Sequence, residues 1–563
     1  MLATDIWDYI VVGGGLAGSV VANRLLALNN DAKILVIEAG PDAENRSDIL
    51  YANSTNLIGG DFDWNYNSVP QESLNKRKIQ SAAGKALGGG SVINTCGWMR
   101  GSKVDFEEWA SLANDSRWGY DGLLPYFRGT ESFWNNSTNP NQHGYDGPMK
   151  VEVPTTTGRV YPLRDAVFNS YEAVGIEALP GLDANAGDNL GFGEIAENRR
   201  NGKRQIASEY YPLNGITVLT ESLVEKILLE DVVINNKSSS SGGNKVVATG
   251  VRLANGTEFR GKEIISSAGS YRTPQLLMLS GIGPVEVLSE YDIEQNLDLP
   301  EVGKGLADHL FLTTEWELAP EYRMDTVDSG NPLFSEAQYG LGQPNNFVAS
   351  YGVSNIPGLT QAISSDEGQA PDPDTHWLLK ETRTFFEAFV LYTNFDPTLP
   401  SNNSYLTAAN VGLLPTSRGS VSINSSDPTV SPVINPNFFA SEVDRFVWRD
   451  GLRKTIKMMV GGASPLSQGI VVGEAPPAGL PALTVDSTDD EIEARIRATA
   501  IGTYHPVGTC SMGKVVDSSL RVIGVNNLRV VDASVIPTPI TAHIQSTVYA
   551  LAEQAADIIA AVR

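Results

Sequence analysis

Three glycines near the N-terminus have the spacing of a dinucleotide-binding turn. Gly13, Gly15 and Gly18 follow a short apolar segment and precede an apolar-periodic stretch. In such a turn the first glycine bends the chain, the second lets a pyrophosphate approach backbone N–H groups, and the third lets the helix pack closely on the strand. Glu38 stands twenty positions after the third glycine and is expected to accept from ribose hydroxyls. Because FAD and NAD share this fingerprint, it does not choose between them.

Thiols and metal-binding side chains are sparse. The two cysteines, Cys96 and Cys510, form neither a disulfide framework nor a CxxC pair, and buried free cysteines usually act as small apolar residues. No two of the five histidines have the i, i+4 spacing of a helical metal site. The sequence therefore predicts no metal and no role for sulfur.

Two longer motifs resemble the signatures of the glucose–methanol–choline (GMC) oxidoreductases. Residues 84–94 (GKALGGGSVIN) resemble the first signature, although Lys85 stands where the family often has arginine. Residues 269–283 (GSYRTPQLLMLSGIG) fit the second signature at every position. This resemblance spans nearly the whole chain and implies that FAD is the cofactor. It implies further cofactor contacts at Gly90, Ser91, Asn94, Val224, Asp532, Ala533 and Ile544.

The resemblance places the catalytic chemistry near the C-terminus. Residues 504–512 (YHPVGTCSM) resemble the family's active-site strand, which makes His505 the catalytic base. An alcohol gives up hydride to flavin N5 more easily if a base takes its hydroxyl proton, and neutral imidazole, with a reference pKa near ~6.5, suits that task. His543 matches the family's second catalytic position, which hydrogen-bonds the substrate oxygen. The other histidines, His143, His309 and His376, are expected to be structural or at the surface.

The residues around His505 indicate a substrate class. Glucose-oxidising members of the family resemble one another in an arginine four residues before the catalytic histidine and an asparagine two before it. Ile501 and Thr503 occupy these places, so an aryl or otherwise apolar alcohol is expected. Trp98 and Tyr504 resemble aromatic residues of the family's substrate pocket.

Several functions remain open under this resemblance. The first is an FAD-dependent alcohol oxidoreductase that passes electrons to O₂ or a quinone. The alternatives are a glucose-type sugar oxidase or dehydrogenase, a hydroxynitrile lyase that retains FAD, and a flavin-bound protein without catalysis. Substrate-dependent bleaching of the flavin separates the oxidoreductases from the other two.

The elements that must position these residues are visible as hydrophobic patterns. Residues 8–12 and 33–37 are apolar runs on either side of a helical stretch that ends at residue 28, so they predict a βαβ unit. Short strands are expected at 216–220, 224–229, 246–253 and 528–531, with a hairpin turn at residues 255–256 and a loop tip at 238–243. A capping box begins a helix at Thr488, and a last amphipathic helix covers 544–562.

The expected fold class is α/β, or α+β overall. A Rossmann-like FAD-binding domain is assembled from discontinuous segments and joined by a substrate domain with an antiparallel sheet. The predicted FAD-binding pieces are 5–150, 206–315 and 515–563, and the predicted substrate-domain pieces are 151–205 and 316–514. Irregular stretches at 364–374 and 474–481 are expected to form rims.

Composition limits the partners. The chain has 563 residues, 41% of them apolar and 19% charged, and a formal charge of −25. Such a charge repels phosphate backbones and anionic lipid, so neither nucleic acid nor membrane is an expected partner, and a monomer or homodimer is expected. No signal peptide is recognised, but the resemblance and the N-x-S/T sequons favour an extracellular protein. These sequons lie at Asn45, Asn53, Asn114, Asn135, Asn136, Asn236, Asn255, Asn402 and Asn424.

Overall fold

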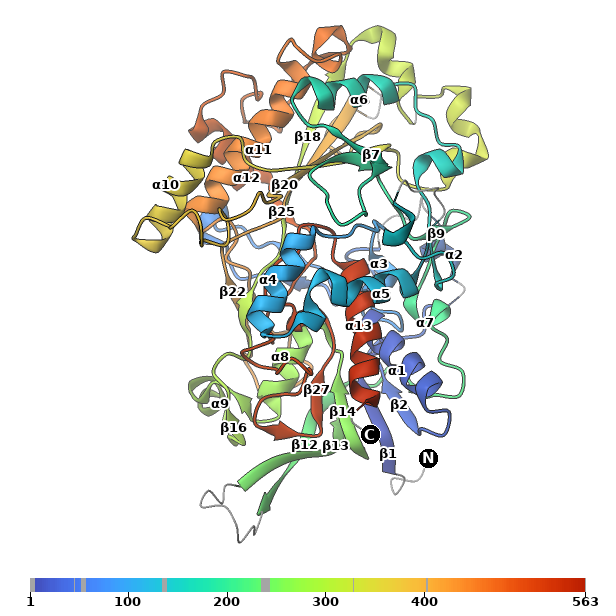
Figure 1. Cartoon of the computed structure of the whole chain (residues 1–563), viewed down its shortest axis with the longest axis vertical. Helices are drawn as coiled ribbons and strands as arrows, with labels where there is room; N and C mark the ends of the chain where they lie inside the picture. Colours follow the sequence, from blue (N-terminus) through green and yellow to red (C-terminus); the bar gives the residue numbers. More distant parts are fainter. Residues whose placement is uncertain are drawn as a thin grey trace.

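Two large β-sheets organise the chain (Figure 1). The computed structural model describes residues 6–561 apart from residues 45, 52–56, 134–138, 234–243, 328 and 401–403. One sheet lies at the lower end of the view in Figure 1, beside both chain termini, and the other lies at the upper end. The predicted α/β class is confirmed.

The first sheet contains the Rossmann-like unit. Its strand order is β11-β2-β1-β14-β13-β12, with β27 added to β14 and β26 to β13. The strands around β1 pair in parallel, whereas β12 and β13 form an antiparallel extension. Their bounds are β1 Ile6–Val12, β2 Ile34–Ile37, β11 Thr217–Leu219, β12 Val224–Val233, β13 Asn244–Leu253, β14 Glu258–Ser266, β26 Val525–Asn526 and β27 Leu528–Val530. Sequence-distant segments therefore build one sheet, as the resemblance implies.

Helices from opposite ends of the chain pack together on this sheet. Helix α1 (Leu16–Leu28) follows β1, and α13 (Gln545–Ala560) lies against α1 (Figure 1). The apolar side chains of α13 are buried on nearly all sides, so this helix is a core element rather than the amphipathic helix predicted from the sequence. It brings the C-terminal segment back to the glycine turn.

The second sheet is mostly antiparallel. Its order is β24-β18-β21-β20-β19-β8-β7, with β25 paired to β18, and all pairs except β7–β8 are antiparallel. The strands are β7 Ala178–Asp183, β8 Gly191–Glu194, β18 Leu310–Leu318, β19 Phe347–Tyr351, β20 Phe386–Leu391, β21 Tyr405–Gly412, β24 Val471–Ala475 and β25 Ile501–Gly502. Helices α6 (Arg164–Ala173), α10 (Ile356–Glu367), α11 (Glu442–Val460) and α12 (Asp489–Thr499) lie at this end of the molecule (Figure 1).

Local predictions have mixed outcomes. The hairpin at 255–256 joins β13 to β14, and the Thr488 capping box begins α12. The stretch 364–374 is not wholly irregular, because its first residues complete α10. The loop tip at 238–243 lies outside the described residues.

The division into domains stays a prediction, and its boundary at 315/316 falls inside β18. Among the described residues no helix has the length and apolarity needed to cross a bilayer.

Candidate functional site

A cavity of about 560 Å³ lies between the two sheets. The glycine turn after β1 and the end of β2 line one side, and side chains of β18 and β20 line the other. The segment 501–506 and the start of α13 complete the wall. The size and the mixed walls are those of a ligand site formed between two layers.

The glycine turn has the shape that a pyrophosphate needs. Gly13 has a φ of +97°, and a Cβ on Gly18 would lie 1.9 Å from the Gly13 carbonyl oxygen. Side chains are therefore excluded at both positions, as the sequence predicted. Gly15 precedes α1 and lines the cavity, and no side chain caps the N–H groups of the first turn of this 13-residue helix. These N–H groups and the helix dipole favour an anion at this place.

A second glycine loop closes on the first. The Gly88 N–H donates to the Gly14 carbonyl (2.8 Å), and a Cβ on Gly89 would lie 2.7 Å from the Gly15 Cα. Gly90 lines the cavity, and a Cβ added to this residue would have no other atom within 4 Å. The two loops form a backbone cradle that a phosphate-linked dinucleotide fits.

Glu38 holds the same turn from the end of β2. Its Oε2 accepts from the Gly14 N–H (2.9 Å) and its Oε1 from the Gly40 N–H (2.8 Å). Burial raises the pKa of Glu38 to about 7, although these backbone bonds oppose the rise. Glu38 lines the cavity, as a ribose-binding residue must.

The other residues predicted to bind the cofactor fall into two groups. Asn94, Val224, Asp532, Ala533 and Ile544 line the cavity. Gly18 and Ser91 lie behind it and support its walls. The Ser91 hydroxyl donates to the Gly88 carbonyl (2.6 Å) and accepts from the Ala207 N–H (2.9 Å), so it shapes the second glycine loop from beneath.

Three histidines lie together at and behind one part of the cavity wall. His505 and His543 both line it, and their ring centroids are 4.9 Å apart with nearly perpendicular planes. His309 lies behind His505, with its Nδ1 3.1 Å from the Nδ1 of His505. The Asp308 carboxylate accepts from the His505 backbone N–H (2.7 Å), which fixes the segment that carries the ring. Two of these histidines were predicted for the site, whereas His309 was not.

The His543 ring has a carboxylate partner from the second sheet. The Nε2 of His543 lies 3.0 Å from Oε1 of Glu387, a residue of β20 that is only 1% exposed. A buried carboxylate at that distance orients the imidazole and keeps a proton on Nε2. No sequence pattern indicates this pair, because 156 residues separate its members.

Several apolar side chains line the cavity on the side of the second sheet. Ile501 lines the cavity and is 39% exposed, and Phe311 and Phe389 line it from β18 and β20. Tyr504 also lines it and has a φ of +64°, a left-handed conformation just before the His505 position. Ile501 and Tyr504 therefore lie where the sequence placed them.

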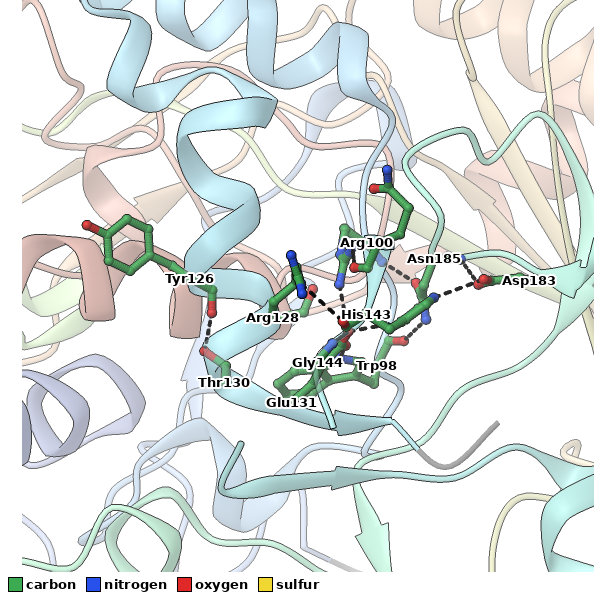
Figure 2. A network of polar contacts seen from close by, with 12 residues as sticks. Trp98, Arg100, Tyr126, Arg128, Thr130, Glu131, His143, Gly144, Asp183 and Asn185 are labelled. Atoms are coloured by element: carbon green, nitrogen blue, oxygen red, sulfur yellow. Dashed lines mark hydrogen bonds and ion pairs between the residues drawn. The ribbon is translucent and has the colours of Figure 1, made fainter. Parts of the chain in front are cut away.

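Trp98 does not line the cavity, which corrects its predicted place in the substrate pocket. Its side chain is 2% exposed and packs on Tyr549, with ring centroids 5.4 Å apart. Its Nε1 donates to Glu131 at 3.2 Å (Figure 2). The ring points into a polar network behind the cavity. Trp98 is therefore a core residue, although its position in the sequence resembles that of a pocket residue of the family.

That network is an ionic cluster around His143 (Figure 2). Nδ1 of His143 lies 2.9 Å from Glu131 and Nε2 lies 2.9 Å from Asp183, while Arg100 pairs with Glu131 at 3.0 Å. Burial lowers the pKa of His143, but the two carboxylates outweigh burial and raise the pKa above its usual value. The structural role expected for His143 fits this setting.

Replacing His143 with leucine should destabilise the protein by about 3–5 kcal/mol, because the buried carboxylates of Glu131 and Asp183 lose the imidazole that binds both of them. The raised pKa means that protonated His143 stabilises the fold. This contribution is complete below a pH of about 6.5 and is lost as the pH rises through the higher pKa of the folded state. Urea unfolding at pH 6 and pH 8 measures the effect. His376→Leu is the control, since its partner Glu367 is 41% exposed. Equal stability of both variants would contradict this role.

Comparison with known proteins agrees with the geometry. The models of the GMC oxidoreductase N- and C-terminal regions match residues 7–311 and 415–552. The GMC-type oxidoreductase acuG of Aspergillus aculeatus is 34% identical over 99% of both chains. An oxygen-dependent choline dehydrogenase of Yersinia pseudotuberculosis is 31% identical over 98% of this chain and 93% of its own. A variant of Aspergillus oryzae formate oxidase has a similar structure, with a TM-score of 0.83 and 26% identity over 99% of both chains. The chain belongs to the GMC oxidoreductase family.

Proposed function

We propose that the protein oxidises an alcohol to a carbonyl compound with His505 as the base. The cofactor is FAD. The observation that carries the proposal is the placement of His505 and His543, with ring centroids 4.9 Å apart, on the wall of a cavity whose other side is the glycine cradle. A substrate in that cavity has a base and a donor at one end and the cofactor site beside it.

The residues that would hold the cofactor lie around the first sheet. The N–H groups at Gly15 and Gly90 would bind the pyrophosphate, and Glu38 would bind the ribose. Asp532 would act through the start of α8 (Gly269–Leu279), because its Oδ2 accepts from the Gly269 N–H at 2.9 Å. Bound FAD supplies the acceptor for the substrate's hydride.

The two histidines divide the remaining work. His505 takes the hydroxyl proton as the C–H bond breaks. His543 donates to the substrate oxygen and stabilises the negative charge that develops there. Nε2 of His543 is bonded to the Glu387 carboxylate, so the hydrogen bond to the substrate oxygen would come from a proton on Nδ1. The phenyl and aliphatic side chains of the wall exclude water from the reacting atoms.

Anaerobic mixing with a panel of alcohols tests this function. Bleaching of the flavin absorbance by an alcohol supports an oxidoreductase. Cleavage of a cyanohydrin without a change of flavin colour would instead identify a hydroxynitrile lyase, the alternative within the same family. An aldehyde or formate that bleaches the flavin when no alcohol does would replace the alcohol as substrate.

The pH dependence of flavin reduction should report His505. Burial first, and then the neighbouring His543 and His309, lower the pKa of His505 well below its usual value. A lowered pKa keeps the base neutral, so the reduction rate should be flat from about pH 6.5 to 8 and fall only at a more acidic pH. Stopped-flow reduction of the wild type across pH 4.5–8 measures this. A rate that halves at pH 7 or above on acidification would contradict it.

Glucose should be a poor substrate. The apolar Ile501 stands where glucose-oxidising relatives are expected to have arginine, and loss of a charged donor from a buried contact costs roughly 1.5–3 kcal/mol, about ten- to a hundredfold in affinity. The comparison of kcat/KM for glucose and for a benzylic alcohol measures the preference. A higher value for glucose would favour the sugar oxidase or dehydrogenase.

We also propose that the protein is extracellular and passes its electrons to O₂ or a quinone. Three sequon asparagines, Asn114, Asn255 and Asn424, are exposed, as glycosylation requires. A shift in mass on endoglycosidase treatment of the native protein tests the first point, and peroxide formation during turnover distinguishes oxygen from a quinone.

A further inference from the structure

We infer that His309 is a positioning residue that sets the tautomer of His505. In this arrangement His505 carries its proton on Nδ1 and donates it to Nδ1 of His309, which leaves Nε2 of His505 as a free acceptor for the substrate hydroxyl. The inference rests on the proposed function, because it matters only if His505 is the base.

The contact itself requires one proton. The two Nδ1 atoms are 3.1 Å apart and the rings are almost perpendicular, at 87°. Two lone pairs at this distance would repel, so one of the two nitrogens must donate to the other. The geometry leaves two choices: either His505 donates to His309, or His309 donates to His505.

The surroundings of His309 decide between them. Its ring also forms a hydrogen bond with the backbone of Leu413. This bond raises the pKa of His309, so the imidazole is its donor and the Leu413 backbone is its acceptor. Since Nδ1 faces His505, the nitrogen that holds this proton is Nε2. Burial, followed by the charge of His543, lowers the pKa of His309 to about 3, so the ring has no second proton. Nδ1 of His309 is therefore an acceptor, and the proton between the rings belongs to His505.

No carboxylate competes for the His505 ring among the described residues. Asp308 accepts from the His505 backbone N–H rather than from the imidazole. Glu387 is bonded to His543. His309 itself is 2% exposed and does not line the cavity, so it acts on His505 from behind and does not touch the substrate.

In this arrangement His505 meets the substrate with an unprotonated Nε2, which is the form that can act as a base. The substrate O–H bond breaks, its proton forms an N–H bond at Nε2 of His505, and the resulting imidazolium keeps its Nδ1–H bond to the neutral His309. Without the acceptor, the His505 ring can rotate or hold its proton on Nε2, where it cannot act as a base. Loss of such a supporting partner typically costs about 10- to 100-fold in activity.

Two variants of His309 separate this role from a structural one. His309→Leu removes the acceptor and should slow flavin reduction about 10- to 100-fold. His309→Asn places an amide oxygen near the position of Nδ1 and should recover most of the rate. His376→Asn is the control and should react as the wild type does, because His376 does not line the cavity and contacts Glu367 instead. Equal rates for His309→Leu and the wild type, or equal losses in both His309 variants, would overturn the inference.

A spectroscopic measurement tests the tautomer without turnover. The FAD-loaded wild type, labelled with ¹⁵N-histidine, contains only five imidazoles, and the signals lost in His505→Ala identify the base. At pH 8 we expect His505 with a protonated Nδ1 and an unprotonated Nε2. The opposite tautomer would overturn the inference while leaving the proposed function intact. Conversely, a wild type whose flavin no alcohol bleaches would refute the function, whatever tautomer is found.

Discussion

With His505 replaced by alanine, an alcohol is expected to reduce the bound flavin about 10²–10⁴-fold more slowly than in the wild type. The reason is the loss of the base that takes the hydroxyl proton, since the other imidazole on the cavity wall, His543, is held as a donor by Glu387. His309 is buried behind the base and has no access to the substrate. No neighbouring histidine is placed to substitute for His505.

Stopped-flow absorbance under anaerobic conditions measures this rate directly. The FAD content of the variant serves as the control, because the glycine cradle and Glu38 are untouched and the cofactor should stay bound. Reduction of His505→Ala at the wild-type rate would show that the base lies elsewhere. A colourless variant would call for the comparison to be repeated with His505→Gln, which retains more of the side-chain volume.

His543→Ala is expected to slow flavin reduction by about 10²–10³-fold, the usual cost of removing one donor to a developing oxyanion. The matched variant His543→Asn keeps a donor at this place and should lose much less. Glu387→Gln retains an acceptor for the His543 ring but loses its charge, so its effect should fall between those of the other two variants.

The same stopped-flow measurement distinguishes donor from scaffold. If His543→Ala and His543→Asn are equally slow, a hydrogen-bond donor alone does not replace His543, and the imidazole itself is required. If His543→Ala reduces normally while His505→Ala is inactive, His543 only supports the wall of the cavity.

Much of the cofactor site could be predicted because its signals are local. Gly13, Gly15 and Gly18 lie within six residues. The structure shows a left-handed turn at Gly13 and a close backbone contact at Gly18, and Gly15 stands at the uncapped N-terminus of α1. Glu38 follows the next strand of the same βαβ unit. Such constraints act over a short stretch of chain, so they are visible in the sequence.

The supporting residues could not be predicted in this way. Glu387 reaches His543 from a strand of the second sheet, and His309 reaches His505 across 196 residues, so only the tertiary packing of the chain brings them together. The sequence predicts only that His309 is structural or at the surface. The predicted place of Trp98 in the substrate pocket was wrong for a different reason. Trp98 resembles a pocket residue of the family in sequence, but its indole donates to the buried carboxylate of Glu131 and does not line the cavity.

Anaerobic titration of the purified FAD-loaded protein with a benzylic alcohol shows whether the protein is an alcohol oxidoreductase with His505 as its base. We expect the flavin absorbance to bleach with one equivalent of aldehyde formed for each flavin reduced, and His505→Ala to show this change only on a much longer timescale. An unchanged flavin spectrum across benzylic, aliphatic and sugar alcohols would refute the proposed function.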